Sequence, residues 1–173
     1  MLIRRDLPED HAAVRGVLSA AFADPAAPAN VPVEIGLVDA LRAGSEWMPP
    51  LSMVAESEGG EVIGYVVCTR GWVDGRPALG LGPLAVLPAV QGRGAGSALM
   101  HAVLGAADAL EEPLVALLGH TEYYPRFGFR PAAELGIAPP VEEWASHFQV
   151  RALSTYELDL SGVFRYARAF DDL

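Results

Sequence analysis

Apolar residues near the N-terminus recur at the spacing of amphipathic helices. One such pattern begins at His11 and ends before the Pro- and Ala-rich segment 24–32, which we interpret as a loop. A second covers residues 33–42 and ends at Gly44, a residue type that commonly terminates helices. Residues 2–5 are apolar and then charged, which favours a short strand. This part of the chain therefore predicts a strand and two helices.

The middle of the chain changes from helical spacing to the pattern of strands. Residues 51–57 and 61–70 are rich in Val, Ile and Tyr, and the glycines between them suit a tight hairpin turn. A second turn at 73–76 leads into a third strand over residues 78–86. These three segments predict an antiparallel meander.

A long helix and a buried strand are expected next. Residues 91–97 lead into a helix that Pro113 halts, with an apolar face formed by Leu99, Val103, Ala106 and Leu110. The continuous apolar run 114–118 is typical of a strand buried on both faces. The remaining elements are shorter: we expect a helix at 121–127, strands at 129–134 and 150–158, and a loop at 136–140.

We expect all of these strands to form one sheet, with the helices packed against it. The length of 173 residues is that of one ordinary domain. No repeat, low-complexity tract or long linker separates a second domain, so we expect a single domain over residues 1–173. The expected fold class is α+β, with a mixed, mostly antiparallel central sheet of about six to seven strands flanked by helices.

Charge and hydropathy exclude several classes of protein. The chain has 12 Lys and Arg against 22 Asp and Glu, a net charge of −10. Phosphate backbones would repel such a chain, so we expect no nucleic-acid partner. No apolar stretch approaches the ~20 residues of a membrane span, so we expect no membrane partner. The N-terminus lacks the apolar segment of a secretory signal, and we expect a cytoplasmic protein.

Disulfide and metal chemistry are not expected either. Cys68 is the single cysteine, which excludes an intrachain disulfide and a multi-cysteine zinc site. It lies in an apolar run, where a cysteine is typically a core residue. The four histidines lack the spacing of a helical zinc site. We therefore expect no metal.

The most informative segment is the glycine-rich turn between the third strand and the long helix. The strand ends in Leu84-Ala85-Val86, and the turn 91–97 contains three glycines, at positions 92, 94 and 96. Free N–H groups and the positive end of the helix dipole converge where such a helix begins. Glycines leave these N–H groups open to a phosphate, and Arg93 adds a positive charge. The alternative is a glycine-rich turn that binds nothing.

The spacing of the glycines and charged residues in this turn distinguishes between classes of phosphate-containing ligand. A mononucleotide P-loop requires a Lys, and residues 84–99 contain none. A dinucleotide fingerprint needs a third glycine where Ser97 stands, and the preceding strands predict hairpins rather than βαβ units. A dinucleotide-binding oxidoreductase domain remains an alternative.

Two ordered motifs resemble those of one enzyme superfamily. Gln91, Gly94 and Gly96 fit Gln/Arg-x-x-Gly-x-Gly/Ala after an apolar strand, and Tyr124 to Phe129 fits Tyr-x-x-x-Gly-Phe. The first resembles the pyrophosphate loop of the GNAT superfamily of acetyl-CoA-dependent N-acetyltransferases, and the second resembles the motif after its fifth strand. The sequence around both motifs is similar to that of a bacterial subgroup of predicted small N-acetyltransferases. The resemblance covers about residues 2–134.

The resemblance implies a co-substrate, acetyl-CoA, and a role for each matching residue. Backbone groups of Leu84, Ala85 and Val86 would pair with the pantetheine arm. Acetyl transfer also needs a donor to the thioester oxygen as charge develops on it, and our candidate for that donor is the main-chain N–H of Val86. Tyr124 would be catalytic, protonating the departing thiolate, because a phenol with a pKa of about 10 stays protonated at neutral pH. The pyrophosphate would be held by Gln91, Gly92, Arg93, Gly94, Ala95, Gly96 and Ser97.

The chain departs from the family in its general base. Many members supply a carboxylate from the fourth strand, but residues 78–86 contain no acidic side chain. Glu122, His120, a residue of the 30–34 loop and a chain of waters are the alternatives, and none of them is assigned. Tyr124 itself has a second interpretation, because the aromatic density around it is typical of core packing.

The sequence thus predicts an N-acetyltransferase that acts on a primary amine by direct attack in a ternary complex. The acidic surface favours a cationic amine, through steering of the encounter. The missing strand carboxylate favours a rival, a non-catalytic acyl-CoA-binding module or sensor, whereas Tyr124 favours an enzyme. Homodimers are common among similar proteins, and the apolar C-terminal segment is a candidate surface for a second copy.

Overall fold

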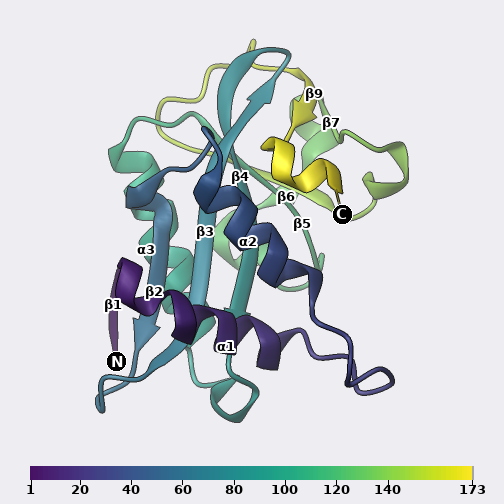
Figure 1. The fold of residues 1–173 in the computed structure, drawn as a ribbon. Coiled ribbons are helices and arrows are strands. Elements are labelled where there is room, and N and C mark those ends of the chain that lie inside the picture. Colours follow the sequence, from purple (N-terminus) through teal and green to yellow (C-terminus); the bar gives the residue numbers. More distant parts are fainter. Residues whose placement is uncertain (173) are drawn as a thin grey trace.

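The computed structural model describes residues 1–172 and forms one open sheet with helices on both faces (Figure 1). The helices are α1 (His11–Ala21), α2 (Val33–Ala43) and α3 (Ala95–Ala109). The strands are β1 (Leu2–Arg5), β2 (Ser52–Glu56), β3 (Val62–Val73), β4 (Arg76–Val86), β5 (Leu114–Leu118), β6 (Arg130–Pro131), β7 (Ile137–Ala138), β8 (Phe148–Ala152) and β9 (Gly162–Arg165). Within residues 1–172, no helix combines the length and apolar character that a bilayer span requires.

The strands lie in the order β1-β2-β3-β4-β5-β8-β6, and β9 pairs with both β3 and β7. The β4–β5 and β7–β9 pairs are parallel and the others are antiparallel. The predicted meander is β2-β3-β4, and the predicted mixed, mostly antiparallel sheet is confirmed. Within residues 1–172 the sheet has nine strands, more than expected, because β7 and β9, strands of two and four residues, were not predicted.

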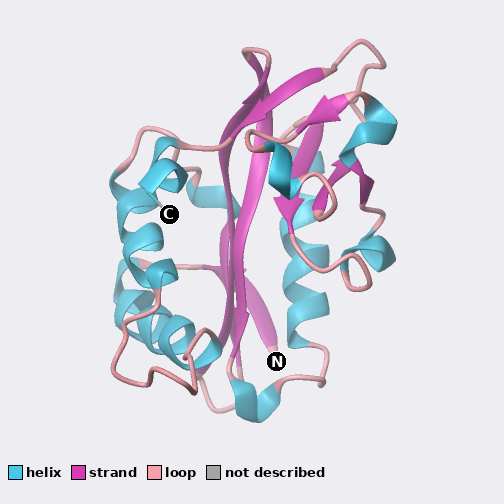
Figure 2. Cartoon of the chain, turned by 90° about the vertical axis from the view of Figure 1, so that its right-hand side faces the viewer, coloured by secondary structure: helices cyan, strands magenta, loops and turns pink. Residues whose placement is uncertain are grey.

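The helices divide between the two faces of the sheet, with α1 and α2 on one side and α3 on the other (Figure 2). Side chains of β3 alternate between these layers, as the two-residue period of a strand requires. Val66 and Cys68 pack in the cluster that contains Leu99 of α3, whereas Tyr65 and Val67 pack with α1 and α2. Cys68 is fully buried, which confirms its expected place in the core.

The region after β5 departs from the sequence prediction. The helix expected at 121–127 is a 3₁₀ turn over Tyr124–Phe127. The strand expected at 129–134 is wrong beyond Arg130–Pro131, because Pro131 lacks a backbone donor and a 3₁₀ helix follows at once. The pairing with β8 therefore ends at Pro131.

The last strands also differ from expectation. The strand predicted at 150–158 is β8, which begins and ends earlier because it pairs antiparallel with β5 over that strand's whole length. The expected loop 136–140 includes β7, and β9 has no counterpart among the sequence predictions.

The chain returns to the α1 and α2 face at its end. β9 pairs with the end of β3, through Trp72↔Arg165 and Val73↔Phe164. The following residues pack beside α2, where Ala167 is buried and Phe170 is half-buried in the same cluster. In Figure 1 this stretch is the yellow 3₁₀ helix next to α2. We call residues 162–172 the C-terminal segment.

Candidate active site

Strands β4 and β5 are paired only at one end. Their parallel register ends at Gly80↔Ala116, although β4 continues to Val86. A bulge lies just beyond the last pair, where Gly82 and Pro83 together oppose a single residue of β3. A bulge bends the strand that carries it. We therefore infer that β4 turns away from β5 after Gly80, and we call the unpaired region between these strands the split.

The free edge of β4 presents main-chain groups to the split. Val86 faces Gly64, and the N–H of Leu87 donates to a β3 carbonyl at 2.9 Å. That bond makes Val86 and Gly64 a non-hydrogen-bonded pair, so the N–H and C=O of Val86 point away from β3. The same alternation turns the main chain of Leu84 away from β3 and that of Ala85 toward it. Leu84 and Val86, but not Ala85, thus offer main-chain groups to a ligand.

The glycine-rich turn follows this edge and begins α3. Gly92 and Gly94 have φ angles of 74° and 93°, which glycine adopts without strain. A Cβ on either residue would meet nothing within 4 Å. The first helical bond runs from the N–H of Ala98 to the carbonyl of Gly94, and among the described residues no side chain caps the helix. The N–H groups of residues 95–97 therefore remain free for an anion.

Two polar side chains of this turn, those of Gln91 and Arg93, are placed differently. The side-chain amide of Gln91 donates to the carbonyl of Val86 at 3.0 Å. This bond ties the turn to the end of β4. Arg93 is exposed beside the glycines. The turn therefore combines a fixed backbone with a solvent-exposed positive charge.

Tyr124 packs on the α3 side of the sheet, beside the end of β5. Its ring lies so close to Gly119 that a Cβ on Gly119 would collide with it. The ring also meets Tyr123 and Phe129 edge-on, at centroid distances of 5.0 and 5.9 Å. Burial, and secondarily Tyr123, raises the pKa of the Tyr124 hydroxyl to about 12. The phenol is therefore held in place and stays neutral at physiological pH.

Tyr123 connects the two motifs and is a residue that sequence reasoning missed. Its hydroxyl lies 3.0 Å from the position of a Cβ on Gly96, so any larger residue at Gly96 would displace it. The Arg126 guanidinium lies 4.7 Å from the centroid of its ring, a distance suited to a cation–π contact. Its only sequence signal is adjacency to Tyr124.

Comparison with known proteins shows which family this chain belongs to. Residues 50–131 match the model of the acetyltransferase (GNAT) domain. YjhQ of Escherichia coli, described as an uncharacterised N-acetyltransferase, is 33% identical over 142 residues, which cover 78% of each chain. YhbS of Escherichia coli, described in the same way, is 30% identical over 174 residues, which cover 99% of each chain. The chain belongs to the GNAT N-acetyltransferase family.

Two solved GNAT structures share its fold. Escherichia coli YhbS, in complex with CoA, matches with a TM-score of 0.87 and 30% identity, over 98% of this chain and 91% of that one. A GNAT family acetyltransferase from Brucella melitensis, in complex with acetyl-CoA, matches with a TM-score of 0.78 and 35% identity, over 98% of this chain and 97% of that one. The α+β fold and the family resemblance predicted from the motifs are confirmed.

The general base of this GNAT chain is not apparent among its side chains. Glu122 and His120 are exposed and line a surface hollow of about 410 Å³ together with His147. Within residues 1–172 no hydrogen bond joins either side chain to that of Tyr124. The main-chain carbonyl of His120 instead accepts from the N–H groups of Tyr123 and Tyr124. These contacts position the Tyr motif without supplying a base.

Proposed function

We propose that this GNAT protein transfers the acetyl group of acetyl-CoA to a primary amine by direct attack in a ternary complex. The supporting observation is the free edge of β4, which has the glycine-rich turn at one end and the split beside it, with Tyr124 on the α3 side. The CoA complex of YhbS and the acetyl-CoA complex of the Brucella melitensis relative support the same co-substrate.

The glycine-rich turn fits a pyrophosphate group. We propose that residues 91–97 hold it, with the free N–H groups of Ala95, Gly96 and Ser97 as donors and Arg93 as a nearby charge. Each hydrogen bond to a charged group contributes about 1.5–3 kcal/mol, whereas a helix dipole contributes about 0.3–1 kcal/mol to an exposed anion. The open N–H groups therefore dominate, and the glycines matter because they leave these groups uncovered.

The edge of β4 fits an extended, amide-containing chain. We propose that Leu84 and Val86 bind the pantetheine arm as a neighbouring strand would, while Ala85 keeps its bonds to β3. The main-chain N–H of Val86 is our candidate donor to the thioester oxygen. The N–H of Leu84 lies on the same edge, further from the turn. Donors fixed in a strand need no reorganisation as charge develops on that oxygen.

Acetyl-CoA supplies the acetyl thioester, and the protons are transferred by Tyr124 and water. The amine nitrogen bonds to the carbonyl carbon as the carbon–sulfur bond breaks. Tyr124 gives its proton to the departing sulfur, and a proton lost from the amine restores the phenol through water, so the products are the amide and the thiol. The raised pKa of Tyr124 keeps the proton available over the physiological range.

The net charge of −10 supports a cationic acceptor, because an acidic surface raises its rate of encounter. Polyamines, aminoglycosides, free amino acids and peptide N-termini all carry suitable amines.

A second candidate is a non-catalytic acyl-CoA-binding module, which the absence of an acidic residue from β4 favours. Release of CoA thiol, measured with a panel of such amines for the wild type and Tyr124→Phe, separates the two. Amine-dependent release that Tyr124→Phe suppresses supports the transferase. Acetyl-CoA binding without release on any amine supports the module.

A further inference from the structure

A second phenol packs against β4 from the opposite face of the sheet. Tyr166 directly follows β9, and its ring lies 2.6 Å from the position of a Cβ on Gly80. Gly80 is the last residue of β4 that pairs with β5. The ring is held by Phe164 and Phe170, at centroid distances of 4.8 and 4.7 Å. Tyr166 is therefore fixed where the split begins.

The hydroxyl of Tyr166 is buried and has no hydrogen-bond partner among residues 1–172. Leaving such a group unpaired costs about 1–3 kcal/mol. Burial, and secondarily the nearby Tyr124, raises the pKa of this phenol, so it stays neutral. Two neutral phenols thus approach the split from opposite faces, and one of them lacks a partner within the described chain.

A large hollow leads to this point from the α1 and α2 face. Its volume is about 1120 Å³, and its walls come from β3, the residues around Trp144 and the C-terminal segment. Tyr166 and Phe170 form part of the wall, and Phe170 lies 3.9 Å from the position of a Cβ on Gly82. The hollow therefore ends at the aromatic rings of Tyr166 and Phe170, which cover β4 beside Gly80 and Gly82 on the face opposite Tyr124.

We propose that the acceptor amine enters through this hollow and that the Tyr166 hydroxyl accepts a hydrogen bond from its nitrogen, aiming the lone pair at the thioester carbon. This inference rests on the proposed transfer reaction and adds a residue to it. Tyr166 touches the amine but takes no proton from it. The two phenols have separate tasks: Tyr166 orients the nucleophile and Tyr124 protonates the leaving sulfur.

Tyr166→Phe tests this role, because it removes the hydroxyl and keeps the ring that packs on Gly80. We expect the melting temperature to be unchanged or higher, since the hydroxyl that is removed makes no hydrogen bond within residues 1–172. We expect the dissociation constant for acetyl-CoA to be unchanged, and kcat/KM for the amine to fall about tenfold, as for one neutral hydrogen bond.

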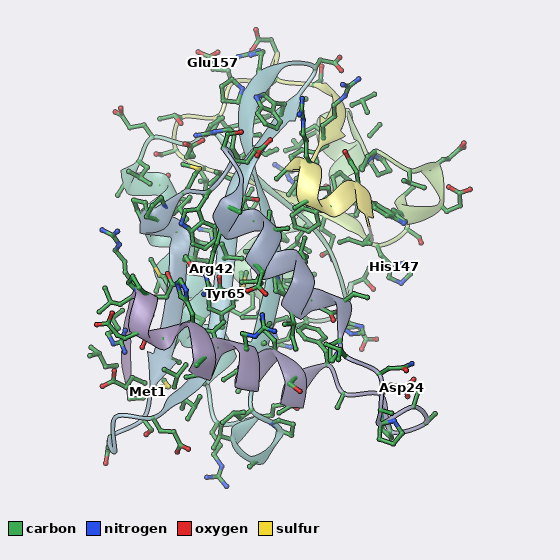
Figure 3. All side chains as sticks on the ribbon, in the orientation of Figure 1. Met1, Asp24, Arg42, Tyr65, His147 and Glu157 are labelled. Carbon is green, nitrogen blue, oxygen red and sulfur yellow. The ribbon has the colours of Figure 1, made fainter. Side chains whose placement is uncertain are left out.

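Tyr65→Phe is the matched control. Tyr65 is also a buried phenol, but it lies under α2 beside Arg42 (Figure 3), and its hydroxyl bonds Ser52 at 2.9 Å. Its loss should lower stability and leave kcat/KM unchanged. An active wild type with an equally active Tyr166→Phe overturns the role of Tyr166 alone. A wild type that acetylates no amine overturns both this role and the proposed reaction.

Discussion

The two faces of the split are built in different ways. On the α3 face, the glycine-rich turn and the Tyr motif are short continuous segments, and each is positioned by its own backbone. On the opposite face, the surface is assembled from β3, the residues around Trp144 and the C-terminal segment, which are distant in sequence. Tyr166 of that segment packs on Gly80 of β4. Both faces carry a phenol packed among aromatic rings, and the first face also offers free main-chain N–H groups to an anion. Under our proposal, co-substrate recognition is therefore local, whereas acceptor recognition depends on tertiary packing.

The largest effect should come from the α3 face, in Tyr124→Phe. Loss of a general acid costs about 10²–10⁴-fold in rate, so kcat should fall by that order while acetyl-CoA affinity is retained. Steady-state CoA release and calorimetry measure the two quantities. An unchanged kcat would remove the acid role.

The pH dependence of the reaction rate gives a second test of the role of Tyr124. Because the pKa of Tyr124 is raised to about 12, its neutral, proton-donating form persists as the pH rises through the range of ordinary assays. The wild-type rate should therefore show no decline from this group between about pH 7 and 10. A descending limb in that range that Tyr124→Phe abolishes would contradict the shift.

Gly94→Val should weaken acetyl-CoA binding about 100-fold. A non-glycine residue at a φ of 93° carries a strain of about 1–3 kcal/mol, and the backbone shift that relieves this strain would displace the free N–H groups that follow. Calorimetric titration measures the loss. Gly105→Ala is the control, since Gly105 is an exposed glycine within α3 with nothing within 4 Å of its Cβ position. It should keep full affinity and gain roughly 0.5–1 kcal/mol of stability.

Gly80→Ala should disrupt the packing on the opposite face of the split. The new methyl group would overlap the Tyr166 ring, which lies 2.6 Å from its position, and overpacking of this kind costs about 1–3 kcal/mol. Denaturant unfolding should show that loss, and kcat/KM for the amine should fall more than the affinity for acetyl-CoA. Gly36→Ala, on exposed α2 surface with nothing near its Cβ position, should stabilise the protein. Equal losses of affinity and kcat/KM in Gly80→Ala would show that the two faces are not separable.

The contrast between the faces also explains what the sequence could predict. The glycine spacing and the Tyr-x-x-x-Gly-Phe pattern are local, so residues 84–86, residues 91–97 and Tyr124 could be selected as candidates from the order of amino acids alone. Pro83 within the predicted third strand was a signal for the bulge, because proline inside a sheet is confined to edges, strand starts and bulges.

Tyr166 could not be predicted in the same way. Its contact with Gly80 arises only when β9 returns to β3, and a four-residue strand carries too little alternation to be recognised. Likewise the pairing that ends at Gly80 depends on the relative placement of β4 and β5 and not on any residue type.

The central claim is that the turn between β4 and α3 binds the co-substrate. Calorimetric titration of the folded wild-type protein with acetyl-CoA tests it most directly. The account predicts saturable binding at one site per chain, with heat that is lost in Gly94→Val and kept in Gly105→Ala. No heat from the wild type, or equal heat from Gly94→Val, would contradict it.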